Sequence, residues 1–296
     1  SADVALEGPN QLPIAPGFTR PLIDPLTPGD RGNWGGMGTY SLDFLHSDIS
    51  AYYREFDDYN PWGLQVGSSF ARYVYAENVK LYGLSWSAGP LLGGGSLGVD
   101  LSYRRNASLI SSNFSAQDNQ GARGDTWHLV VNGLWLLPRT AYFDTGNFIA
   151  EMAYSRVQRV TDHKDLFKGE GYAGCPAGQD KAWGCATRDY LGVAFSFAPQ
   201  WLGVFPGWNI SAPMSFDYGV SGNAATGGGS EGKYSYKIGV KGTLDERYDV
   251  TLAYIGYGSP RKYADIPGVG KTVVGGSGDI GLSDRNWISL TLSTAF

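Results

Sequence analysis

The chain repeatedly alternates apolar and polar residues, and this pattern constrains its fold more than any other feature. The clearest stretch is 285–296, where Ile288 and Leu290 alternate with Ser289 and Thr291. Successive side chains of an extended strand point to opposite faces, so this stretch predicts a β-strand with one apolar and one polar face. Such a strand belongs either to a soluble sandwich or to a barrel whose apolar face contacts lipid.

The same period recurs along the chain and predicts about twelve strands, within a range of ten to fourteen. The predicted strands are 36–45, 49–57, 64–75, 79–89, 95–105, 125–136, 146–157, 188–198, 209–220, 234–241, 248–254 and 285–296. No run of 18 apolar residues occurs, so a helical membrane span is excluded. A membrane protein with this sequence must therefore be a β-barrel.

The predicted connections alternate in length, which favours a membrane barrel. The long ones are 106–124, 158–187, 221–231 and 258–284, and the short ones are 137–145, 199–207 and 245–246. Outer-membrane barrels have long extracellular loops and short periplasmic turns. The sequence therefore predicts an all-β, transmembrane, antiparallel β-barrel whose last strand ends at Phe296 on the periplasmic side.

Composition limits the classes of partner. Only 17% of residues are charged, and the net charge of −5 argues against binding nucleic acid, which attracts clustered cations. The 19 Tyr and 9 Trp cluster towards strand ends, which is typical of the aromatic girdles at membrane interfaces. Tyr and Trp also favour strands in general, and this alternative stays open.

The start of the chain and one cysteine-containing loop lie outside the predicted strands. Residues 1–33 are rich in proline and do not alternate, so we expect a separate non-barrel segment before a barrel at 34–296. The start at Ser1, without a Met, indicates a processed or truncated product. Cys175 and Cys185 flank a short polar loop and predict one disulfide in an oxidising compartment, with a reduced pair as the alternative.

Alternation also predicts which side chains face the barrel interior. The pore-lining candidates are Asp100, Arg104, His128, Asn132, Glu151, Asn209, Asp217, Lys237, Lys241 and Asp249. This lining is polar and of mixed charge, so it would either conduct small polar solutes or knit the barrel shut. Across the tight turn at 245–246, Lys241 and Asp249 are placed to form an ion pair.

Catalytic chemistry has little support in this sequence. An outer-membrane hydrolase would have to use one of three histidines, His46, His128 or His163. His128 falls on the predicted interior face, while His163 lies beside acidic residues in a long loop. Neither a zinc-binding His pair nor a nucleophile elbow is present, so we expect no enzyme, no metal and no cofactor.

Four segments carry a resemblance to a known family. They are 51–62 (AYYREFDDYNPW), 72–84 (RYVYAENVKLYGL), 98–106 (GVDLSYRRN) and 201–229 (WLGVFPGWNISAPMSFDYGVSGNAATGGG), and the closing 284–296 also fits. These segments resemble the proteobacterial outer-membrane family called domain of unknown function 1302. Members are longer, with extra residues before the matching region, so the resemblance is mainly to the C-terminal half of the family.

The resemblance implies an outer-membrane barrel that handles hydrophobic compounds, as a channel or as the outer partner of an export route. We therefore expect a channel or transport barrel for small or hydrophobic solutes in the bacterial outer membrane, in contact with its lipid. A structural barrel that holds an envelope protein partner is the alternative. An outer-membrane hydrolase is the weakest of the three hypotheses.

Overall fold

A computed structural model describes most of the chain. The described residues are 11–15, 18–25, 27–29, 32–43, 46–58, 62–66, 69–91, 93–112, 121–283 and 285–294. Phe296, on which the predicted last strand ends, lies outside them, as do residues 1–10. Over the described ranges the structure is all-β apart from a 3-10 helix at Lys181–Trp183, and it has no helix long and apolar enough to cross a membrane.

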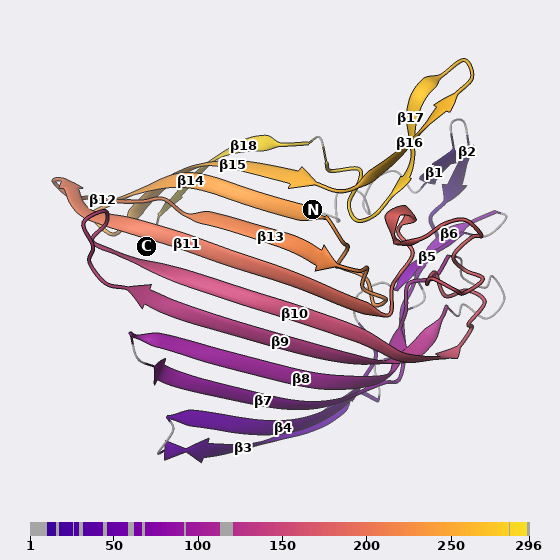
Figure 1. Ribbon diagram of the computed structural model, residues 1–296, viewed down its shortest axis with the longest axis horizontal. Coiled ribbons are helices and arrows are strands. Elements are labelled where there is room, and N and C mark those ends of the chain that lie inside the picture. Colours follow the sequence, from indigo (N-terminus) through magenta and orange to yellow (C-terminus); the bar gives the residue numbers. More distant parts are fainter. Residues whose placement is uncertain are drawn as a thin grey trace.

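One large antiparallel sheet dominates the structure (Figure 1). Its strands are β3 (Trp34–Leu42), β4 (Ser47–Phe56), β7 (Val79–Leu91), β8 (Gly95–Ser108), β9 (Arg123–Leu137), β10 (Thr145–Asp162), β11 (Asp189–Phe205), β12 (Trp208–Ser211), β13 (Met214–Ser221), β14 (Tyr234–Leu244), β15 (Tyr248–Gly258) and β18 (Trp287–Thr294). Apart from β12 and β13, consecutive strands of this sheet pair with each other from β3 to β18, which confirms the predicted antiparallel sheet.

The predicted strand 209–220 is two strands in the structure. β12 and β13 follow one another between the same neighbours, β11 and β14, so twelve strands fill eleven positions. Pro213 lies at the break and lacks the N–H that a continuous ladder needs. Ala212 donates to the carbonyl of Pro199 at 3.0 Å, and Pro213 accepts from the N–H of Gly239 at 2.9 Å. The interruption therefore leaves these backbone groups paired.

The predicted wall strand 64–75 is wrong. This segment forms a separate two-stranded sheet of β5 (Gly63–Val66) and β6 (Ala71–Val74) within the connection between β4 and β7. Residues 67–69 are Gly-Ser-Ser, which favour a turn, and each half is too short to cross a bilayer. Two further hairpins also stand apart from the large sheet: β1 (Gln11–Ala15) with β2 (Phe18–Pro21), and β16 (Arg261–Ile266) with β17 (Gly270–Gly276).

The large sheet has two unpaired edges, β3 and β18. No pairing joins them among the described residues, and Figure 1 shows them at opposite margins of the curved sheet. Neighbouring strands alternate in direction, so the first and eleventh positions run the same way. The described sheet is therefore open, and its two edges are parallel to each other.

The connections between wall strands alternate in length along the whole sheet. The short ones are 43–46, 92–94, 138–144, 206–207 and 245–247, and the long ones are 57–78, 109–122, 163–188, 222–233 and 259–286. Each set gathers at one end of the sheet because successive strands are antiparallel. The alternation predicted for the later part of the chain therefore also holds in the first hundred residues.

The strand register separates the side chains into two faces. Leu84, Leu101, Leu129, Tyr154 and Leu191 pair in one continuous row across five strands, on what we call the apolar face. The opposite face, which we call the polar face, carries a neighbouring row. That row consists of Tyr52, Gly83, Ser102, His128, Ser155 and Tyr190.

Four long connections fold together into a compact cap at one end of the sheet, at the right of Figure 1. We define the cap as the described residues of 109–122, 163–188, 222–233 and 259–286. The cap has a buried apolar core that it shares with the end of β10. This core consists of Leu109, Ala122, Val157, Val160, Phe167, Ala186 and Ala225.

A buried asparagine joins three of these connections. The side-chain amide of Asn223 donates to the carbonyls of Lys181, at 2.7 Å, and Cys185, at 2.8 Å. Its oxygen accepts from the hydroxyl of Ser277, at 2.9 Å, and from the N–H of Glu231, at 3.0 Å. Because Asn223 is only 2% exposed, water does not replace these bonds.

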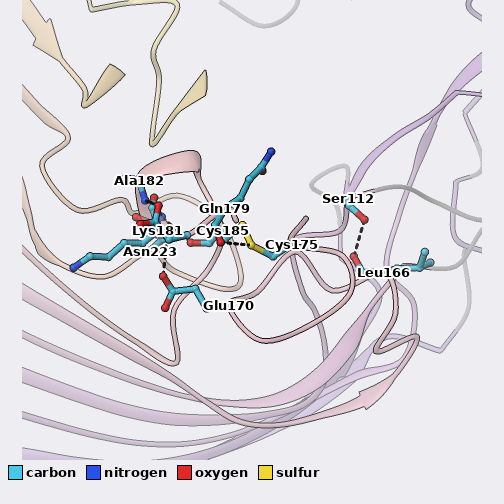
Figure 2. Close-up of a disulfide and its surroundings, with 10 residues drawn as sticks. Ser112, Leu166, Glu170, Cys175, Gln179, Lys181, Ala182, Cys185 and Asn223 are labelled. Carbon is cyan, nitrogen blue, oxygen red and sulfur yellow. Dashed lines mark hydrogen bonds between the residues drawn. A yellow bond between two sulfur atoms is a disulfide. The ribbon is translucent and has the colours of Figure 1, made fainter. Parts of the chain in front are cut away.

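The predicted disulfide between Cys175 and Cys185 is confirmed, and it lies in the cap beside Asn223 (Figure 2). Inside the ring that it closes, the carboxylate of Asp180 accepts from the N–H of Ala182 at 2.9 Å and caps the 3-10 helix. The disulfide and the Asp180 hydrogen bond together fix the loop that carries the two carbonyls to which Asn223 donates.

We expect Asn223→Ala to loosen the cap, because it removes four hydrogen bonds and leaves two of the partners, Cys185 and Ser277, buried. The expected loss is about 2–4 kcal/mol of local stability, whereas Ser277→Ala, which removes one bond, costs about 1 kcal/mol. Limited proteolysis within 163–188 measures the opening of the cap. Equal cleavage rates for wild type and Asn223→Ala would show that the amide does not hold it.

The cap also contains an ion pair that makes its stability depend on pH. The hydrogen bond from Lys181 Nζ, at 2.7 Å, and then the N–H of Gly222 lower the pKa of Glu231. This stabilisation is present above the ordinary value of 4.5 and is lost as pH falls through the lower pKa of the folded state.

We therefore expect the cap amides of the wild type to exchange faster with solvent deuterium as the pH falls below about 4.5, after correction for intrinsic rates. Glu231→Gln removes the titrating group, so its corrected protection should change much less over this range. The hypothesis fails if both proteins show the same pH profile.

Candidate functional site

All ten predicted interior residues lie on the polar face. Asn132 pairs with Glu151, and Glu151 shares a register row with Asp217 through Ala194. The other strands follow the same parity. The residues are Asp100, Arg104, His128, Asn132, Glu151, Asn209, Asp217, Lys237, Lys241 and Asp249.

One group of these residues lies beside the short turns. Lys241 Nζ is 2.9 Å from the carboxylate of Asp249, so the predicted ion pair is confirmed. Thr243 Oγ1 donates to the same carboxylate at 2.6 Å. Nearby, Asn209 accepts from the N–H of Gly203 at 2.9 Å. This group holds strand ends and a turn together.

A second group, Glu151 and Asp217, lies further along the polar face, where the cap contacts this face. A small pocket of about 160 Å³ lies between the wall residues Glu151 and Asp217 and the cap residue Lys233. The ring of Tyr190 fills the space beside Gly229, where a Cβ would lie only 2.2 Å from the Tyr190 Cζ. The cap can approach the wall this closely because residue 229 has no side chain.

The third group contains Arg104 and His128, at the cap end of β8 and β9. His128 Nε2 is 2.9 Å from Thr126 Oγ1. Arg104 and His128 line a cavity of about 350 Å³ between the polar face and three of the long connections. Its lining consists of Phe56, Asp58, Trp62, Val79, Arg104, Ala107, Ser108, Leu109, Ile110, His128, Thr226 and Gly227. The Nε of Arg104 is buried and has no hydrogen-bond partner.

The three histidines do not form a common site. His46 lies in the turn before β4, His128 lies within β9, and His163 directly follows β10, 3.7 Å from the carboxylate of Asp162. His128 bonds to the hydroxyl of Thr126 rather than to a carboxylate. Among the described residues, no group of three or more His, Cys, Asp or Glu could hold a metal ion.

The apolar face carries two rows of aromatic side chains. Towards the cap, Tyr53, Tyr82, Tyr103 and Trp127 occupy one register row, and Tyr103 and Trp127 have ring centroids 4.6 Å apart. Towards the short turns, a second row consists of Trp135, Phe148 and Phe197. Eight residues separate the rows along β9, roughly 27 Å of strand.

Sequence reasoning missed Asn223, Tyr190 and Trp62. The triplet at 227–229 is the one available signal, because clustered glycines indicate a turn or a close backbone approach. Sequence alone cannot show that Asn223 is buried, since its four partners come from three different connections.

Comparisons with curated proteins and with solved structures gave no match. A family model described as "Protein of unknown function (DUF1302)" matches residues 1–296. The match covers the whole chain, including the Pro-rich start, so the expected restriction to the C-terminal half of the family needs correction. The chain belongs to the DUF1302 family.

Proposed function

We propose that this chain forms the wall of a transport barrel in the bacterial outer membrane, which passes small or hydrophobic solutes. The observation that carries the proposal is the exposed apolar face of the large sheet. Leu290 is 66% exposed and Leu84 is 55% exposed, and both lie on strands whose opposite face is polar. An apolar surface that spans a whole sheet needs lipid or a partner to cover it.

The aromatic rows support placing this face in a bilayer. Aromatic girdles mark the two interfaces of outer-membrane barrels, about 25 Å apart across the apolar band. With a strand tilt of about 40°, the roughly 27 Å of strand between the rows corresponds to about 20 Å of height, which is of this order. In this arrangement the short turns are periplasmic and the cap is extracellular. Thr294 pairs with Tyr248, next to the turn at 245–247, so the end of β18 is also periplasmic.

Closure of the barrel requires strands beyond the described wall. Edges β3 and β18 run in the same direction, so an all-antiparallel closure takes an odd number of additional strands. This requirement favours the second candidate function, a barrel that holds an envelope protein partner, because unpaired edges can accept strands from another chain. A lone, heat-modifiable monomer after purification from membranes would exclude the partner.

We expect a charge on the apolar face to destabilise the protein in lipid. Leu290→Lys should lower the free energy of unfolding in vesicles by about 2–4 kcal/mol, as for lipid-facing positions near the bilayer midplane. Thr291→Lys, one residue along on the polar face, is the matched control and should cost much less. Guanidinium titration of the refolded variants measures both, and equal losses would contradict the placement of the apolar face in lipid.

Transport itself predicts ion current or solute flux. Protein purified from outer membranes and inserted into planar bilayers should give current steps, because the polar face would line a hydrated path. Protein boiled before addition is the control. Folded, inserted protein that shows neither current nor solute flux would exclude the channel and leave the partner-holding barrel.

A further inference from the structure

The cavity at the cap end of the polar face contains an unsatisfied cationic group. Arg104 Nε is buried without a hydrogen-bond partner, and Arg104 forms no salt bridge within the described chain. Its cross-strand neighbours, Leu81 and Thr126, carry no charge. A buried guanidinium N–H without an acceptor is costly, so this site favours a ligand that brings one.

The other polar residues of the lining are His128, Asp58, Ser108 and Thr226. His128 uses Nε2 in its bond with Thr126, so Nδ1 is the ring nitrogen that remains for a ligand. Asp58 is the carboxylate of the lining, and it already has an interaction of its own. The Nε of Arg104 therefore still lacks a hydrogen-bond acceptor, and an anion is a stronger acceptor for it than a neutral group.

The lining also has an apolar part, and one of its rings is fixed in place. Phe56, Leu109 and Ile110 contribute apolar surface. The indole of Trp62 is held by a bond from its Nε1 to the carbonyl of Leu109 at 2.9 Å, and Arg123 lies 4.8 Å from its ring centroid. A ligand that fits both parts has one anionic group and an apolar body.

We propose that this cavity is a binding site for small organic anions, with a carboxylate bonded by Arg104 and His128 and an apolar body against Phe56 and Trp62. The proposal deepens the proposed transport function, because it names the solute class that the polar face selects. The binding site itself does not depend on conduction.

Calorimetry of the folded protein in detergent micelles tests the site, with benzoate as the probe and benzamide as its uncharged isostere. The wild type should bind benzoate roughly tenfold or more tightly than benzamide, because the bond to Arg104 is charge-assisted. Arg104→Ala should remove this preference. Lys237→Ala, which removes a cation from the same face outside the cavity, should keep it.

Arg104→Lys is a second variant that tests the site even if Arg104→Ala does not fold. It retains the charge without the guanidinium fork, so it should bind benzoate more weakly than the wild type and still prefer it to benzamide. Equal binding of both probes by the wild type, or unchanged preference in folded Arg104→Ala, would overturn the site. Retained binding without conductance would instead remove the channel and leave the site standing.

Discussion

The backbone hydrogen-bond ladder of the large sheet is the constraint on which the other features depend. Each strand of this sheet between the edges β3 and β18 is paired on both sides, so its register, and with it the face of every side chain, is fixed by its neighbours. The ladder thereby produces continuous rows, such as the aromatic row of Tyr53 and Trp127, from residues far apart in sequence. A slip of one residue in one strand would bring charges onto the apolar face.

Alternation in the sequence predicted the faces correctly, because the period of two is a local property of each strand. It assigned all ten candidate residues to one face. It did not predict that seven of them lie in three separate groups, since the offset between strands depends on pairing that no single segment contains. The hairpin at 63–74 was misread as wall for a related reason, because a short hairpin and a strand share the same local period.

The cap was beyond sequence reasoning because its stability comes from contacts between distant connections. Phe167 and Ala225 belong to one buried core although they come from different loops. Gly229 leaves space for the ring of Tyr190, and this matters only when the loop lies against the large sheet. Loop residues of this kind carry weak local signals, whereas the cysteine pair was predictable because its ring is short and local.

The amide of Asn223 has a consequence for how the cap moves. It bonds residues of three connections at once, so none of the three can detach without breaking bonds that also hold the others. Segments linked in this way tend to open as one cooperative unit with a single free energy, rather than fraying separately. Thr226 and Gly227, which belong to one of these segments and line the Arg104 cavity, would then move together with the whole unit.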